Sequence, residues 1–106
     1  MNNNNPKKIY YFEIIQNSIQ KELEKEYMLL YPEFMAHNSV FLESDSLTDK
    51  FYLINSLSFI NTFIKKLEEL SIVFNFNDKT DKFINNDDIL SSYETQRIMK
   101  IFLNNS

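Results

Sequence analysis

Apolar residues recur at steps of three and four over the first third of the chain, which is the pattern of one helical face. Pro6 suits the first turn of a helix, and Pro32 disfavours helical geometry in the residue before it. The pattern therefore predicts a first helix that begins at Lys7 and ends before Pro32. Its stripe comprises Ile9, Phe12, Ile15, Ile19, Leu23, Tyr27 and Leu30.

The stretch from Ser46 to Lys82 has the clearest period and punctuation. Between Ser56 and Leu70 the apolar positions cover most of a helix's circumference, so this helix should be central to its domain. Each large apolar side chain that it buries contributes about 1.5–3 kcal/mol. These positions are Leu57, Phe59, Ile60, Phe63, Ile64, Leu67 and Leu70.

The apolar period changes after this helix. Ile72, Phe74 and Phe76 alternate with their neighbours, which is strand spacing. Asn77 to Asp81 is rich in turn-forming residues, and residues 82–85 can return as a second short strand. The pattern predicts a β-hairpin that leans on the helices.

Shorter elements complete the predicted order. Residues 31–43 can form a short second helix from Pro32, and Ser46 can cap a segment in which Leu47, Phe51 and Ile54 share a face. Asn86, Asp87 or Asp88 can cap a last helix. The predicted fold is mainly α with a small β-hairpin, and the alternative is an all-α helical bundle in which residues 46–73 form one unbroken helix.

Composition narrows the possible chemistry. The chain has 106 residues, no Gly, no Cys, one His and one Arg, and a net charge of −4. We expect a single domain over residues 6–106 after a polar, flexible tail at residues 1–5. Without Cys or Gly there is no thiolate metal site and no Gly-rich phosphate loop. We therefore expect no enzyme, no catalytic residue, no cofactor and no metal site. No apolar run suggests a membrane span or a secretory signal, so a cytoplasmic location is expected.

Several segments resemble parts of one known family. Tyr31-Pro32-Glu33-Phe34 resembles the entry to a second helix, and Ser56-Leu57-Ser58-Phe59-Ile60-Asn61 resembles the start of a recognition helix. Residues 64–70 resemble the end of that helix, and residues 78–82 resemble a wing tip. Together they resemble the MarR-type winged helix-turn-helix regulators, including the small staphylococcal accessory regulators, over residues 31–85. Ser71 stands where that family usually has Gly.

The resemblance implies a small regulator, of transcription or of a plasmid or phage, that binds double-stranded DNA as a homodimer through its first and last helices. Short polar side chains would reach base edges or phosphates, and lysines would neutralise phosphates. The implied DNA-binding residues are Ser58, Asn61, Thr62, Lys65, Lys66, Lys79 and Lys82.

The acidic balance favours a different class of function. DNA-binding domains usually present a basic face, whereas this chain has more carboxylates than cations and one Arg. The alternative is a non-enzymatic protein-binding module, such as an acidic phage-encoded inhibitor or a small structural subunit of a larger assembly.

Overall fold

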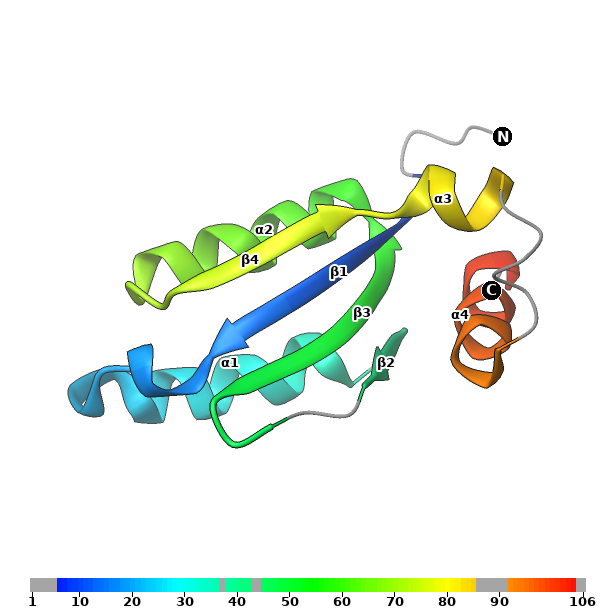
Figure 1. Cartoon of the computed structure of the whole chain (residues 1–106). Coiled ribbons are helices and arrows are strands. Elements are labelled where there is room, and N and C mark those ends of the chain that lie inside the picture. The colour runs from blue at the N-terminus through cyan, green and yellow to red at the C-terminus, as the bar shows by residue number, and fades with distance from the viewer. Residues whose placement is uncertain (1–5, 37, 43–44, 86–91, 105–106) are drawn as a thin grey trace.

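An antiparallel β-sheet is the centre of the structure, a computed structural model that describes residues 6–36, 38–42, 45–85 and 92–104 (Figure 1). Four strands form this sheet in the described residues. The elements, in chain order, are β1 (Lys7–Ile15), the 3-10 turns η1 (Gln16–Ser18) and η2 (Lys21–Leu23), α1 (Glu24–Met35), β2 (Ser39–Phe41), β3 (Thr48–Ser56), α2 (Leu57–Glu69), β4 (Phe74–Asp78), α3 (Thr80–Asn85) and α4 (Tyr93–Leu103).

The strands lie in the order β2-β3-β1-β4, so the first strand of the chain is an inner strand of the sheet. β1 is antiparallel to both of its neighbours, with Phe12 opposite Phe51 of β3 and Phe76 of β4. Up to β4 the elements follow a β-α-β-β-α-β order, which is the split β-α-β arrangement. In this arrangement α1 and α2 can cover the same face of the sheet.

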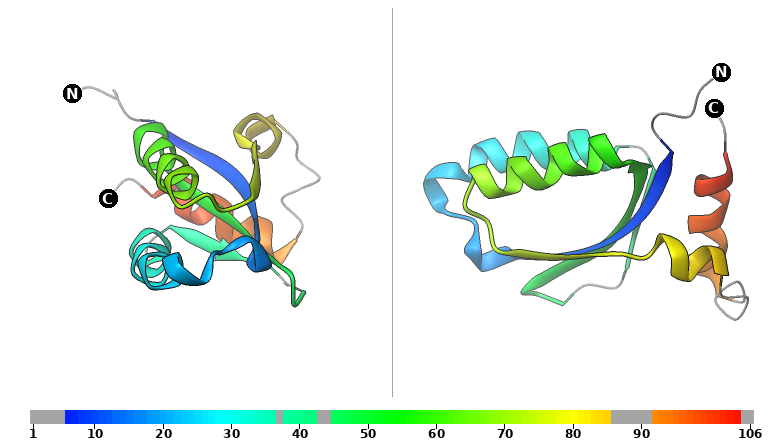
Figure 2. Two further views of the ribbon diagram at one scale, coloured as in Figure 1. Left: turned by 90° about the vertical axis from the view of Figure 1, so that its left-hand side faces the viewer. Right: turned by 90° about the horizontal axis from the view of Figure 1, so that it is seen from above.

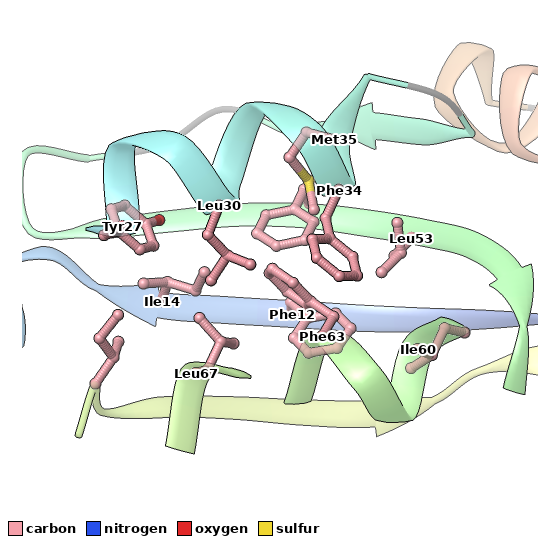
Figure 3. Packing of buried hydrophobic residues seen from close by; sticks show 12 residues of the cluster. Phe12, Ile14, Tyr27, Leu30, Phe34, Met35, Leu53, Ile60, Phe63 and Leu67 are labelled. Carbon is pink, nitrogen blue, oxygen red and sulfur yellow. The ribbon is translucent and has the colours of Figure 1, made fainter. Parts of the chain in front are cut away.

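Both long helices indeed lie on one face (Figure 2). Alternate residues of the inner strands point toward them and make the larger part of the core (Figure 3). The Phe12 ring stacks on Phe51 at 5.4 Å and meets the edge of Phe63 from α2 at 5.3 Å. Phe34 of α1 lies 5.2 Å from Phe63, so the two helices are joined by aromatic contacts above the strands.

The opposite face of the sheet is covered only in part, by α3 and α4. Ile9 and Ile54 point to this face and are fully buried there with Val40, Phe83 of α3 and Ile98 of α4. The Lys7 ammonium donates to the carbonyl of Ile101 at 3.0 Å and to that of Asn104, so it caps the end of α4. The first strand and the last helix are therefore held together.

The prediction of a mainly α fold with a small hairpin is wrong, and so is the all-α alternative, because the protein is a mixed α/β fold with an antiparallel sheet. The largest error is the first predicted helix, since residues 7–15 are β1. Ile9 is buried under α4 while Phe12 and Ile14 are buried under the other helices. A strand buried on both faces has no strict alternation, and its apolar spacing imitated a helix.

Other predicted boundaries are wrong as well. Pro32 lies inside α1 and does not end it. Of the predicted second helix, residues 31–35 are helical as the end of α1, whereas residues 39–41 are β2. The segment from Ser46 to Ile54 gives way to β3. In β3, Phe51 points to one face and Ile54 to the other, and both are fully buried, which again produced a three-residue apolar step.

The predicted central helix and the strand that follows it are confirmed. α2 begins at Leu57, and Ser56 caps it by accepting from the Phe59 amide at 3.2 Å. β4 follows as predicted. The predicted return strand is wrong, because residues 82–85 belong to α3 and no wing exists in the described residues. The predicted caps of the last helix, Asn86, Asp87 and Asp88, lie outside the described residues. Within the described residues, Ser92 caps α4 by accepting from the Thr95 amide.

Candidate functional site

The predicted DNA-binding residues of α2 share one exposed face. Their spacing of three and four residues places them on the side of α2 that points away from the sheet. All of these side chains are exposed, and they are Ser58, Asn61, Thr62, Lys65 and Lys66. Exposure alone does not make them a binding surface, because any amphipathic helix has a solvated face.

Part of this face is engaged within the helix itself. The Thr62 hydroxyl donates to the Ser58 carbonyl at 2.9 Å, and the Ser58 hydroxyl lies 3.2 Å from that of Ser56. These short side chains are therefore occupied by local contacts. Asn61, Lys65 and Lys66 are the members of the set that extend into solvent.

Lys79 and Lys82 are not brought to this face. Lys79 follows β4, and its amide donates to the Ile9 carbonyl at 2.7 Å. Lys82 is exposed on α3, whose Phe83 packs on the opposite face of the sheet from α2. The predicted wing contacts are thus separated from the predicted recognition helix.

A groove between α1 and α2 is the most complete candidate site. It has a volume of about 560 Å³ and combines an apolar floor with a charged rim. Leu30 and Phe34 are buried in its floor, whereas Leu29 is 73% exposed at its side. Its lining residues are Glu26, Leu29, Leu30, Glu33, Phe34, Thr62, Lys66, Glu69 and Leu70.

Helical spacing explains how the sequence builds this groove. On α1 the lining residues fall three, four, seven and eight positions after Glu26, and on α2 they fall four, seven and eight positions after Thr62. Each helix therefore presents one continuous stripe to the groove. The two stripes face the same space because both helices lie on the same side of the sheet.

The rim of the groove is acidic. Its charged side chains are the carboxylates of Glu26, Glu33 and Glu69 and the ammonium of Lys66. Three negative charges against one positive charge leave a formal net charge of −2. A groove with an apolar floor and an acidic rim is complementary to a segment that carries apolar and basic side chains on one face.

Sequence reasoning missed this surface, although α1 contains a signal for it. Residues 27–31 form an uninterrupted apolar run, and at 100° per residue such a run covers the whole circumference of a helix. Tyr27 and Leu30 take the buried side, so Met28 and Leu29 are left 62% and 73% exposed. An apolar run longer than one helical face predicts exposed apolar area on a surface helix.

The Tyr27 phenol is buried beside the groove floor without a function that the geometry can assign. Its hydroxyl has no hydrogen-bond partner among the described residues. Burial, with smaller contributions from Tyr31 and Asp49, raises the pKa of Tyr27 far above its usual value of 10.0. Burial therefore favours the neutral phenol.

The half of the sheet that α3 and α4 leave open is a second surface. Tyr11 of β1 lies there, and its ring centroid is 5.3 Å from that of Tyr52 of β3. Tyr52 marks the border of this surface, because its ring packs edge-on against Phe83 of α3 at 5.4 Å. The Tyr11 hydroxyl donates to a Glu13 carboxylate oxygen at 2.7 Å. Stacking platforms for single-stranded nucleic acid require a positively charged groove, and this carboxylate opposes phosphate binding.

Metal-ligating side chains and helix length are two further features of the described residues. Among them, no group of three His, Cys, Asp or Glu side chains could hold a metal ion. No helix of the described residues is both long and apolar enough to cross a bilayer.

Comparison with known proteins found no family model, no curated protein and no solved structure that matches the chain.

Proposed function

We propose that this protein is a non-enzymatic, cytoplasmic protein-binding module whose α1–α2 groove takes a basic amphipathic segment of a partner protein. The observation that supports the proposal is the pairing of an apolar floor and the 73% exposed Leu29 with a rim of net negative charge. An amphipathic helix laid into a hydrophobic groove is a recurring mode of peptide recognition.

Apolar side chains of the partner would supply most of the affinity. Covering Leu29 and filling the space over Leu30 and Phe34 removes apolar surface from water, at about 1.5–3 kcal/mol for each large side chain that becomes fully buried. The exposed carboxylates at the rim contribute less to affinity, about 0.2–1 kcal/mol per ion pair. Their main effects are to select basic partners and to raise the association rate.

DNA binding through α2 stays a prediction, and the geometry supports it less well. α2 lies against the sheet along its length, so only its outer face could approach a duplex (Figure 2). On that face the cations Lys65 and Lys66 are followed directly by the exposed Glu68 and Glu69. Counterion release requires several uninterrupted cationic contacts, which this face does not provide.

A labelled peptide tests the proposal. The probe is a helical peptide of about 20 residues with Leu at helical spacing on one face and Lys flanking that face, titrated by fluorescence anisotropy at low and moderate salt. We expect saturable binding that weakens as salt rises, because the rim contacts are screened. Combining Leu29→Ala with Glu33→Lys should weaken binding at least tenfold, which corresponds to about 1.4 kcal/mol.

The controls separate the groove from general charge attraction. Glu94→Lys changes the net charge by the same amount as Glu33→Lys, but Glu94 lies exposed on α4. This variant should bind the peptide as the unmodified protein does. The proposal fails if the groove variant and the α4 variant behave alike, or if a Glu-containing version of the peptide binds equally well. Tight binding of an AT-rich DNA duplex that is lost in Lys65→Ala, with no peptide binding, would favour the DNA-binding prediction.

A further inference from the structure

β4 is an open edge of the sheet. Its pairing partner is β1, and no described residue pairs with its other side. Figure 1 shows β4 at the margin of the sheet. Open edges present unpaired backbone N–H and C=O groups and attract further strands unless they are protected.

The ladder shows which backbone groups face outward. The Ile15 amide donates to the Val73 carbonyl at 3.0 Å, and the Lys79 amide donates to the Ile9 carbonyl at 2.7 Å. Hydrogen-bonded and non-hydrogen-bonded pairs alternate along an antiparallel ladder. With Phe12 opposite Phe76, the backbone groups of Asn75 and Asn77 therefore face β1. Those of Phe74 and Phe76 face away from the sheet.

The side chains of this edge are uncharged over four consecutive residues. Phe74 and Phe76 share the helix-covered face, where their rings lie 6.1 Å apart, and Phe76 is still 45% exposed. Asn75 and Asn77 point to the other face, along a hollow of about 500 Å³. Protected edges usually carry Lys, Pro or a bulge, and residues 74–77 contain none of the three. The opposite edge strand, β2, is protected by being only three residues long.

We propose that β4 pairs antiparallel with β4 of a second copy of this chain, about a two-fold axis at Phe76. This pairing would join two four-stranded sheets into one continuous sheet. Phe76 would exchange backbone hydrogen bonds with its own counterpart, and the two Phe76 rings would meet on one face, where Phe74 lies opposite Asp78 of the second copy. On the other face Asn75 would meet Asn77 of the second copy.

A second copy fits this edge better than an unrelated strand for two reasons. The Phe-Asn-Phe-Asn alternation is self-complementary, because an antiparallel copy places like side chains on the same face. In addition, two copies of a chain with a net charge of −4 repel each other over most of their surfaces. The uncharged residues 74–77 are a place where two acidic copies can approach.

This interface differs from the dimer that the sequence predicted through its first and last helices. The first of those helices does not exist over residues 7–15, which are an inner strand. The α1–α2 groove plays no part in the β4 interface, so the two proposals fail independently. A strand of five residues buries little area, so the dimer should be weak and depend on concentration.

Sedimentation equilibrium tests the assembly. From about 10 µM to 1 mM the apparent mass should rise from 12.7 kDa toward twice that value. Phe76→Lys places a charge at the axis and should stay monomeric at every concentration. Ile84→Lys adds the same charge at a residue that is 50% exposed on α3, and it should dimerise like the unmodified chain. A chain that is monomeric at 1 mM, or equal loss of dimer in both variants, would overturn the proposal.

Amide exchange in the unmodified chain tests the geometry without any substitution. On concentration, the amides of Phe74 and Phe76 should exchange at least about tenfold more slowly, because a second strand now covers them. The amides of Asn75 and Asn77, already paired with β1, should change little. A dimer whose formation leaves Phe74 and Phe76 unprotected would place the interface elsewhere and refute the assignment to β4.

Discussion

Ser71 has a left-handed backbone conformation, which proteins usually assign to glycine. It follows α2 with φ of 58°, in the left-handed region. Its amide donates to the Glu68 carbonyl at 3.0 Å, and the next amide, of Ile72, donates to Leu67 at 3.1 Å. This is the Schellman arrangement that ends many helices, usually with Gly at this position. Because the chain has no Gly, a Ser stands here, and its Cβ makes the left-handed conformation sterically unfavourable.

Ser71→Gly should therefore stabilise the fold. The left-handed region costs a non-glycine residue about 1–2 kcal/mol, and the greater freedom of Gly in the unfolded chain offsets part of the gain, so we expect a net of about 1 kcal/mol. Urea unfolding followed by circular dichroism measures it. Ser58→Gly, the same substitution at a helical position of α2, should destabilise by about 0.5–1 kcal/mol. Effects of the same sign in both variants would contradict this explanation.

The Tyr27 hydroxyl should be dispensable for stability. A buried polar group without a partner costs about 1–3 kcal/mol of desolvation, and Tyr27 has no partner among the described residues. We expect Tyr27→Phe to raise the free energy of unfolding by up to about 1 kcal/mol, measured in the same urea titration. Tyr11→Phe, which removes the hydrogen bond to Glu13, should not stabilise. A clear loss of stability in Tyr27→Phe would mean that its hydroxyl has a partner in the folded protein.

At the scale of elements, the Thr80 hydroxyl helps to hold α3 against the sheet, together with the packing of Phe83. The Thr80 hydroxyl accepts from the buried Ile9 amide at 2.9 Å, at the point where β4 has ended and the ladder can no longer supply an acceptor. The Thr80 amide in turn donates to Asp78 at 2.9 Å, which turns the chain out of the strand. Residues 77–81 are therefore a strand-to-helix turn and not the tip of a hairpin.

Thr80→Val tests this connection. Val has nearly the same shape but cannot accept, so the Ile9 amide would be buried without a partner at a cost of about 1–3 kcal/mol. Thr80→Ser keeps the acceptor and should retain most of the stability. Thermal unfolding of the three proteins compares them, and equal stability of the Val and Ser variants would show that the hydrogen bond is unimportant.

The apolar pattern predicted α2, which is apolar on one side, and failed for β1 and β3, which are buried on two. α2 keeps a polar stripe, and Ser56 marks its start, so pattern and cap agree. β1 and β3 have apolar residues directed to both faces, and three-residue steps such as Phe51 to Ile54 then arise without any helix. α3 and α4 cover part of the second face, and no local pattern in β1 or β3 can reveal this.

The candidate site could be predicted only in part for a related reason. The exposed face of α2 follows from its period, and five of the seven proposed DNA contacts lie there. A groove, however, needs a second wall, and that wall is α1, placed by the crossover from β1 to β2. When residues 7–15 are taken for a helix, the position of α1 beside α2 cannot be predicted, and Leu29 cannot be recognised as part of a groove.

At the scale of the whole molecule, the sheet holds together segments that are far apart in the sequence. β1 pairs with residues 48–56 and 74–78, and Lys7 contacts the carbonyl of Ile101. These contacts also decide which surfaces are available. α1 and α2 close one face, and α3 and α4 close part of the other. The groove and the β4 edge are the surfaces at which we propose that a further polypeptide binds.

The inner position of β1 has a consequence for folding during synthesis. This strand leaves the ribosome before the elements that cover it, because its two neighbours are completed only at residues 56 and 78 and α4, which packs on Ile9, ends at residue 103. Until then a strand of mostly apolar residues, from Ile9 to Ile15, has no lasting partner. Contacts of such high sequence separation slow folding and prolong exposure to aggregation. β1 is thus vulnerable to aggregation until α4 has been synthesised.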